Sequence, residues 1–232
     1  MKNNQQVIII LGPPGAGKGT QATLLTDKLG LFYFETSKII EKKVMGAVKD
    51  DKEVIEGKEY PLLEEKRLWE TGTLCSPPVV SLWVKEKIRS LAEENQGIVI
   101  AGSPRTLFEA REVTPLMEDS YGKENIRVIL LELEPDDSIW RNSHRRICEL
   151  MRHPILFNQE TENLKICPLD GSKLMKREKL DDAEVIKVRL EEYRTRTLPI
   201  VGYLKDKGLD VVSIDASLTP AEVFKKVMEA IK

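Results

Sequence analysis

A glycine-rich loop near the start of this chain joins an apolar run to a helical pattern, and it limits the possible folds more than any other part of the sequence. The run is QVIIIL at 6–11, the loop is GPPGAGKGT at 12–20, and the helical pattern over 18–30 closes at Gly30. A short β-branched run bounded by turn residues is typical of a strand buried on both faces of a parallel sheet. The sequence therefore predicts a strand, a tight loop and a helix in direct succession.

The composition of this loop predicts that it holds phosphate groups. Its glycines let backbone N–H groups turn inward around an anion, the helix N-terminus adds its dipole, and Lys18 supplies a full charge. A strict phosphate loop has Ser or Thr directly after the lysine, whereas Gly19 stands before Thr20 here. A glycine-rich turn without a ligand is the alternative, and the order of strand, loop, lysine and helix argues against it. The residues predicted to contact ATP in this loop are Gly12, Gly15, Ala16, Gly17, Lys18, Gly19 and Thr20.

Apolar runs alternate with helical patterns along the rest of the chain. Further strands are expected at 31–34, 97–102, 126–134 and 209–215. Helices are expected at 36–72 with a break at 57–61, and at 77–95, 106–119, 135–147, 181–208 and 219–231, while 148–180 has no clear period. This alternation predicts an α/β fold of the P-loop NTPase type, with a five-stranded parallel sheet flanked by helices. Ligands of such sheets bind beyond the carboxyl ends of the strands, so the functional residues are expected there.

Composition and charge narrow the class of function. The chain has 232 residues, 41% of them hydrophobic and 32% charged, and its formal net charge is −2. A dedicated nucleic-acid binder carries a basic excess, so that class is disfavoured. Three cysteines do not suggest a disulfide framework and favour a reducing, cytoplasmic location. The apolar run at 6–11 is too short for a signal segment or a membrane span, so no membrane association is expected.

Several motifs together resemble the adenylate kinases and related nucleoside monophosphate kinases. The loop GPPGAGKGTQA has that family's glycine between lysine and threonine, and the resemblance continues in order over nearly the whole chain. The further motifs are TGTLCSPPVV at 71–80, GSPRTLFEA at 102–110, RNSHRR at 141–146 and RLEEY at 189–193. The resemblance implies a core domain at 1–34, 77–146 and 181–232, an acceptor-nucleotide subdomain at 35–76 and a lid at 147–180. It also implies a monomer that transfers the γ-phosphate of ATP, bound with Mg²⁺, to a nucleoside monophosphate.

The same resemblance assigns a set of arginines to the transferred phosphate. Phosphoryl transfer is mainly positioning and neutralisation of negative charge, and guanidinium groups fit phosphate oxygens well. Arg141 and Arg145 are spaced so that one helix face is expected to present both. Any one arginine taken alone is equally compatible with a surface ion pair. The predicted catalytic residues are Lys18, Arg105, Arg141, Arg145, Arg177 and Arg189, with Arg141 also at the ATP; the predicted acceptor-binding residues are Thr36, Thr73, Leu74, Gly102, Arg105 and Glu109.

One departure from the family's pattern affects the metal. The family has Asp-Gly-Phe-Pro-Arg after the third strand, where the aspartate holds water ligands of Mg²⁺, and this chain has Ala101 at that position. Glu132, near the end of the fourth strand, is a candidate substitute; the alternative is a strand-end glutamate paired with a basic residue. Loss of such an outer partner typically costs about 10–100-fold in affinity or activity. Reduced activity is therefore expected, and a catalytically weak ATP-binding sensor stays open as an alternative.

Other departures affect the acceptor pocket. Glu41 replaces the arginine that grips the acceptor phosphate in the family, and Lys38 and Lys42 either supply the lost charge or are solvated. Glu109 replaces a glutamine that contacts adenine, and a carboxylate offers only acceptors, which suits the N–H donors of guanine better. An acceptor other than AMP, such as GMP, is thus an alternative, unless Glu109 points to solvent. Residues 50–60 look like an insertion, which is expected to add a helical turn.

The lid segment contains a candidate zinc site. Relatives staple the lid through Cys-x₂-Cys and Cys-x₂-Asp pairs, and Cys167 with Asp170 fits the second pair. In the first pair Cys148 is followed by Met151, a poor ligand, whereas His153 precedes an aromatic residue at the spacing seen in relatives. The set Cys148, His153, Cys167 and Asp170 has sound tetrahedral zinc chemistry for a lobe too small to have its own core. A metal-free lid held by packing is the alternative.

Overall fold

The central feature of the structure is a five-stranded parallel sheet. The computed structural model describes residues 5–176 and 181–232. The strand order across the sheet is β10–β6–β1–β5–β2, and each neighbouring pair is parallel. The strands are β1 (Val7–Leu11), β2 (Phe32–Glu35), β5 (Ile98–Ala101), β6 (Ile126–Glu132) and β10 (Val211–Asp215). The predicted α/β fold with this sheet is confirmed.

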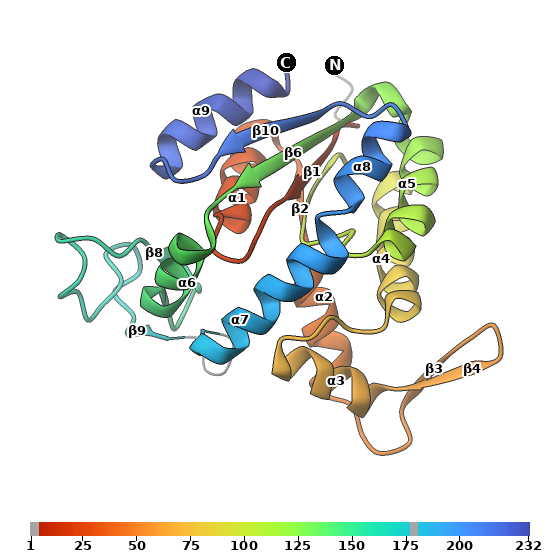
Figure 1. Ribbon diagram of the computed structural model, residues 1–232, viewed down its shortest axis with the longest axis horizontal. Helices are drawn as coiled ribbons and strands as arrows, with labels where there is room; N and C mark the ends of the chain where they lie inside the picture. Colours follow the sequence, from red (N-terminus) through yellow and green to blue (C-terminus); the bar gives the residue numbers. More distant parts are fainter. Residues whose placement is uncertain (1–4, 177–180) are drawn as a thin grey trace.

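Helices cover both faces of the sheet (Figure 1). One face packs on α1 (Lys18–Leu29) and α9 (Pro220–Ala230). The other face packs on α4 (Pro77–Glu93), α5 (Leu107–Tyr121) and α8 (Ile200–Asp206). Among the described residues, no helix is long and apolar enough to cross a membrane.

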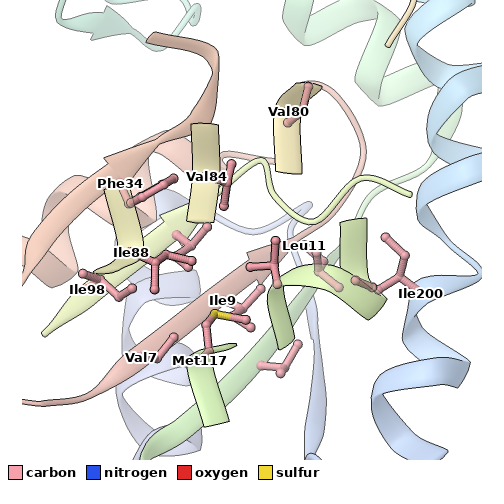
Figure 2. Close-up of a cluster of buried hydrophobic side chains, with 14 of the residues drawn as sticks. Val7, Ile9, Leu11, Phe34, Val80, Val84, Ile88, Ile98, Met117 and Ile200 are labelled. Atoms are coloured by element: carbon pink, nitrogen blue, oxygen red, sulfur yellow. The ribbon is translucent and has the colours of Figure 1, made fainter. Parts of the chain in front are cut away.

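The strand β1 contributes side chains to both layers. Val7, Ile9 and Leu11 join the cluster on the α4 and α5 side, which Figure 2 shows, whereas Ile8 and Ile10 join the cluster on the α1 side. Because successive side chains of a strand point to opposite faces, a strand between two helix layers needs an apolar residue at every position. This explains the unbroken apolar run that precedes the loop.

Three helix ends follow the sequence signals. Gly30 closes α1 in the left-handed conformation, with φ of 68°. Thr219 caps α9 and forms a capping box with Glu222. Pro135 stands in the first turn of α6 (Pro135–His144). These positions agree with the known preferences of glycine at C-caps, threonine at N-caps and proline in first turns.

In the segment 36–72, the structure differs from the prediction of a helix with one break. The segment contains two helices with a β-hairpin between them, at the lower right of Figure 1: α2 (Thr36–Val44), β3 (Lys52–Ile55), β4 (Lys58–Pro61) and α3 (Leu62–Thr71). Glu56 and Gly57 both have positive φ, 51° and 79°, as in the two-residue turns that join antiparallel strands. The insertion at 50–60 therefore forms a hairpin rather than the expected helical turn.

The segment 181–208 is also not one helix. α7 (Ala183–Glu192) continues into a π-helical turn, Tyr193–Thr197, and α8 begins after Pro199. Proline lacks a backbone N–H and clashes with the carbonyl group four residues earlier, so it interrupts a regular helix. The preceding helix, α6, likewise ends at His144 rather than at 147.

The segment that lacked a sequence period forms a small sheet of its own. β7 (Arg146–Cys148) lies between β8 (Pro154–Ile155) and β9 (Leu174–Met175), and both pairs are antiparallel. It lies apart from the main sheet, beside α6 at the left of Figure 1. Strands this short carry too little alternation to be recognised from the sequence.

Candidate active site

A cavity of about 540 Å³ lies beyond the carboxyl ends of the central strands. This is where a parallel sheet is expected to bind its ligand. Most residues selected from the sequence line it: Gly12, Gly15, Ala16, Gly17, Lys18, Gly19, Thr20, Thr73, Leu74, Gly102, Arg105, Arg141, Arg145 and Arg189. Thr36 and Glu109 are not part of its wall, and Arg177 lies outside the described residues.

The phosphate loop turns tightly into the N-terminus of α1. Gly15 and Gly17 have φ of 80° and 84°, a conformation that residues with a Cβ atom rarely adopt. The Lys18 ammonium donates to the carbonyl oxygens of Gly12 and Pro13 at 2.7 and 2.8 Å, which holds it over the loop. The first turn of α1 directs its backbone N–H groups and the positive end of its dipole toward the same space.

Three arginines surround Lys18. Burial, and then the charges of Arg105, Arg189 and Arg145, lower the pKa of Lys18 well below its ordinary value. Burial also lowers the pKa of Arg105. The three arginines come from the turn after β5, from α7 and from the end of α6. Such a concentration of positive charge is complementary to a polyanion, because phosphate oxygens both neutralise it and accept its hydrogen bonds.

Glu109 holds the turn that carries Arg105. The backbone N–H of Arg105 donates to Glu109 Oε2 at 2.9 Å, and the hydroxyl groups of Ser103 and Thr106 donate to the same carboxylate. Glu109 is 1% exposed, and burial raises its pKa above the ordinary value despite these hydrogen bonds. The carboxylate expected to contact the acceptor base, or else solvent, instead braces a turn, because its oxygens are taken up by donors of that turn.

Arg141 and Arg145 reach the cavity from different local structures. Arg141 lies in the last turn of α6 and donates to the carbonyl oxygens of Ala216 and Ser217 at 2.8 and 3.0 Å. α6 ends at His144, and Arg145 has extended backbone with ψ of 136°. The expectation that one helix face presents both arginines is therefore wrong, although both line the cavity.

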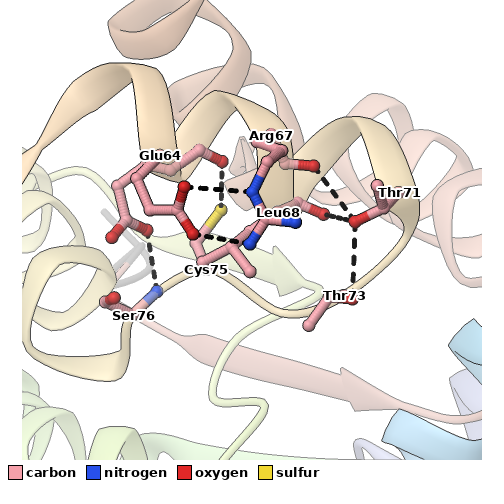
Figure 3. Close-up of polar contacts among 8 residues, drawn as sticks. Glu64, Arg67, Leu68, Thr71, Thr73, Cys75 and Ser76 are labelled. Carbon is pink, nitrogen blue, oxygen red and sulfur yellow. Dashed lines mark hydrogen bonds and ion pairs between the residues drawn. The ribbon is translucent and has the colours of Figure 1, made fainter.

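The turn after α3, which Figure 3 shows, carries Thr73 and Leu74, two predicted acceptor-binding residues that line the cavity. The Thr71 hydroxyl donates to the carbonyl oxygen of Arg67 at 3.0 Å, and its oxygen lies 3.4 Å from that of the Thr73 hydroxyl, within hydrogen-bond distance. On the other side of the turn, the Ser76 N–H donates to Glu65 Oε2 at 2.8 Å. These contacts fasten both ends of the turn to α3, so Thr73 and the residue after it face the cavity.

Gly72 lets this turn approach α7. Its φ is 82°, and a Cβ atom on it would stand 2.8 Å from a methyl group of Val185 and 3.1 Å from Cγ of Arg189. A side chain at this position would therefore push the turn away from α7. The close approach brings Arg189 next to the predicted acceptor-binding residues.

The helix α2 contributes less to the cavity than its sequence suggests. Thr36 is fully buried, and its hydroxyl has no hydrogen-bond partner among the described residues. Lys38 pairs with Glu35 at 2.9 Å and is largely exposed. Glu41 and Lys42 do not line the cavity. Within the described chain, then, no basic residue of α2 takes the place of the arginine that Glu41 replaces.

Glu132, the candidate substitute for the acid missing at Ala101, lies away from that position. Ala101 ends β5 and lines the cavity, whereas Glu132 ends β6, with β1 between the two strands. The Glu132 carboxylate accepts a hydrogen bond from the Ser213 hydroxyl of β10 at 3.0 Å and does not line the cavity. The geometry therefore favours a strand-end glutamate engaged with its own neighbour.

Two features of the cavity were not predicted from the sequence: an aromatic wall and the carboxylate of Glu35. The Trp140 ring stacks on His144 with centroids 4.7 Å apart, and Phe157 meets it edge-on at 5.8 Å. Trp140 and Phe157 line the cavity, as do Tyr33 and Glu35 of β2. A flat apolar wall of this kind suits a nucleobase. The available signal in the sequence was Trp140, a large aromatic residue among the charged and polar residues of α6.

Cys148, His153, Cys167 and Asp170 come together in the small sheet, with their ligand atoms all within 4.8 Å of one another. Cys148 Sγ lies 3.0 Å from Asp170 Oδ2, and His153 Nδ1 lies 3.4 Å from that oxygen and 3.7 Å from Cys167 Sγ. A tetrahedral zinc centre, with metal–ligand distances of about 2.0–2.3 Å, spaces its ligand atoms about 3.3–3.8 Å apart. Both thiols are free and buried, whereas Met151 is 63% exposed. The donor set and its spacing fit Zn²⁺.

Comparison with known proteins agrees with this arrangement. A family model described as adenylate kinase matches residues 10–209. The chain is 31% identical to the adenylate kinase of Caldicellulosiruptor saccharolyticus, over 97% of this chain and 98% of that protein. It is 30% identical to the adenylate kinase of Clostridium tetani, over 95% of each chain, and 29% identical to that of Gemmatimonas aurantiaca, over 97% of this chain and 99% of that protein. The motifs, the sheet and these similarities agree, and the chain belongs to the adenylate kinase family.

Proposed function

We propose that this chain is a nucleoside monophosphate kinase that transfers the γ-phosphate of ATP reversibly to AMP. The observation that carries the proposal is the convergence of Lys18, Arg105, Arg141, Arg145 and Arg189 on one cavity with the phosphate loop. Five cations from α1, the turn after β5, the end of α6 and α7 match the negative charge that spreads over a transferring phosphoryl group. The adenylate kinase relatives support AMP, rather than GMP, as the acceptor.

In this proposal the phosphate loop holds the ATP phosphates. The N–H groups of the loop and of the first turn of α1 bind phosphate oxygens, and Lys18 moves its ammonium from the loop carbonyls onto the β- and γ-phosphates. Thr20 lies beside Lys18 in the cavity wall and is the residue of the loop that would hold the Mg²⁺ of MgATP. That ion neutralises charge on the β- and γ-phosphate oxygens.

The arginines divide between the two nucleotides. Arg105 and Arg189 lie toward the turn that carries Thr73, and we assign them to the acceptor phosphate. Arg141 and Arg145 lie at the end of α6, toward Trp140, and we assign them to the transferring phosphate and the ATP side. Donors fixed in place before the reaction lower the entropic cost of aligning the acceptor oxygen with the γ-phosphorus atom.

In this proposal, the two inserted segments move to close over the bound nucleotides. The core comprises 1–34, 77–146 and 181–232, the acceptor-nucleotide subdomain 35–76, and the lid 147–180. Each inserted segment has its own small sheet, which supports the division. Closure excludes water and so limits wasteful hydrolysis of ATP.

Zn²⁺ held by the four ligands of the lid would have a structural role, since all four coordination positions are taken by side chains. A monomeric state and a cytoplasmic location stay predictions.

Unless another carboxylate takes the place of the acid missing at Ala101, we expect a turnover lower than that of the same site with an acid at this position. Alanine offers no oxygen to a metal-bound water, and the loss of such a contact typically costs about 10–100-fold. The comparison that tests this point is kcat for the wild type and for Ala101→Asp, measured side by side in the same buffer. Equal kcat values would contradict it.

The decisive experiment supplies MgATP with AMP, GMP, CMP, UMP or dTMP in turn and follows ADP formation. Fastest turnover with AMP is the expected result. Arg105→Ala is expected to lower kcat/KM for AMP about 100-fold or more, while Arg194→Ala, which removes an exposed arginine paired with Glu191 outside the cavity, leaves it unchanged. Tight ATP binding without turnover would overturn the kinase in favour of a nucleotide sensor.

A further inference from the structure

Glu35 and Ala101 end two neighbouring parallel strands, β2 and β5. They are register partners across the β2–β5 ladder, and neighbouring strands lie about 4.8 Å apart. Side chains at partner positions point to the same side of a sheet. Tyr33 of β2 and Ala101 of β5 both pack into the cluster on the α1 side, so the side chain of Glu35, two residues after Tyr33, also projects toward α1 and the phosphate loop.

The side chains of β2 on this face reach the phosphate loop. A Cβ atom placed on Gly19 would stand 3.1 Å from the Tyr33 hydroxyl, so that hydroxyl lies against the residue between Lys18 and Thr20. Glu35 lines the same cavity as Thr20 and Ala101. After burial, the charge of Glu35 is the next cause of the raised pKa of Tyr33. The carboxylate is therefore electrostatically coupled to a group that touches the loop.

The carboxylate of Glu35 has capacity for further hydrogen bonds. Oε1 accepts from the Ser37 hydroxyl at 3.2 Å, and Oε2 pairs with the Lys38 ammonium at 2.9 Å. A carboxylate offers about four lone-pair sites, so donors such as metal-bound waters can still bind. The Lys38 side chain is 66% exposed, and an exposed ion pair of this kind is weak enough to rearrange.

We propose that Glu35 is the positioning residue that holds a water ligand of the Mg²⁺ in MgATP, in place of the acid missing at Ala101. This rests on the proposed kinase function. Glutamate is one methylene longer than aspartate, and contact through a metal-bound water adds further reach, so the carboxylate spans the single strand spacing from β2. Mg²⁺ keeps several of its waters when it binds protein and phosphate, which makes a contact through water sufficient. Glu132 is less suited to this role, since β1 separates its strand from that of Ala101 and it does not line the cavity.

The charge of Glu35 is expected to weaken the binding of metal-free ATP and to strengthen the binding of the metal ion. The proposal can therefore be tested by binding measurements, without measuring turnover. A carboxylate in the cavity repels metal-free ATP, so Glu35→Gln should leave its affinity unchanged or raise it. The same carboxylate attracts a hydrated divalent cation, so Glu35→Gln should weaken metal binding to the protein–ATP complex about 10-fold. Glu132→Gln is the matched control and should change neither quantity.

The experiment titrates ATP calorimetrically in excess EDTA, and then measures Mn²⁺ binding to the protein–ATP complex by electron paramagnetic resonance. The wild type, Glu35→Gln, Glu132→Gln and the double variant Glu35→Gln with Ala101→Asp are compared. Recovery of Mn²⁺ affinity in the double variant is expected, because the new aspartate restores a carboxylate one strand away.

Two results would overturn the proposal. In the first, Glu35→Gln binds Mn²⁺ as tightly as the wild type, which leaves Glu35 without a role at the metal while the kinase itself stands. In the second, Glu35→Gln weakens metal-free ATP and Mn²⁺ equally, which indicates a general loss of site structure. A wild type that binds no ATP in either condition would instead overturn the proposed function and this inference together.

Discussion

Arg145 and Asp181 form an ion pair of 2.5 Å that joins the end of α6 to the residues just before α7. The Asp181 side chain is 2% exposed and that of Arg145 is 24% exposed. The guanidinium also donates to Asn142 Oδ1 at 2.9 Å. The pair holds Arg145, which lines the cavity, in position at the point where the chain passes from the core into the small sheet of the lid.

Asp181→Asn should lower the free energy of unfolding by about 2 kcal/mol, since it removes a buried carboxylate charge that pairs with a largely buried guanidinium. Urea unfolding monitored by circular dichroism measures this change. The matched control is Glu184→Gln, which removes an exposed partner of Lys187 on α7 and should have no measurable effect. Equal destabilisation by both variants would show that the Asp181 pair contributes no more than a surface pair.

Lys18→Met should abolish the stabilisation of the protein by ATP. At an ATP concentration about 100 times Kd, binding adds roughly 2.7 kcal/mol and raises the Tm of a chain of this size by roughly 5–11 °C. Methionine keeps the length of the side chain and removes the charge, so this shift should nearly vanish. Differential scanning fluorimetry with and without ATP gives the answer. Lys187→Met, which removes an exposed lysine outside the ATP cavity, should retain the full shift.

Glu109→Gln should become relatively more stable than the wild type as the pH rises from 4.5 to neutrality. Burial raises the pKa of Glu109 in the folded protein. Between its unfolded and folded pKa values the native state holds more protons than the unfolded state, so wild-type stability falls as pH rises through that window. Glutamine does not titrate and escapes this loss. Urea unfolding of both proteins across the pH series tests the trend, and a difference in stability that does not change with pH would contradict it.

Cys167→Ser should remove zinc from the lid. Protein purified without chelator is expected to contain one zinc per chain by elemental analysis, and the serine variant close to none, because a hydroxyl group is a much weaker zinc ligand than a thiolate. Met151→Leu changes the exposed thioether near the same ligands and should retain the metal. A wild type without zinc would leave packing and hydrogen bonds as the only supports of the lid.

The main sheet and its helix layers could be predicted because β1 and β5 are apolar at every position and helical patterns separate the five strands along the chain. The β3–β4 hairpin could not, since its strands, KEVI and KEYP, show no strict alternation of charged and apolar residues, and Val54 is 58% exposed. A pattern of this kind is equally compatible with a polar helix when its antiparallel partner is unknown.

The part of the cavity formed by the phosphate loop could be predicted, because all residues of that part belong to one continuous motif. The cavity was less predictable where contacts cross between motifs. Glu109 occupies a family position for base recognition, yet three donors of its own turn take up its carboxylate. Glu35 drew no attention in the sequence, because its relation to Ala101 exists only in the register of β2 against β5.

The pairing of β7 with β9 has a consequence for how this chain can change. Ile147 lies opposite Met175 and Cys148 opposite Leu174, so the chain leaves for the lid and returns from it at neighbouring points. The lid is thus a side branch on the core, and few contacts of the main sheet depend on its length or content. A short linker from 148 to 174 would bridge the two strands without disturbing β1, β5 or β6. Substitutions that gain, lose or exchange a metal can therefore accumulate in the lid while the folding of the nucleotide-binding core stays intact.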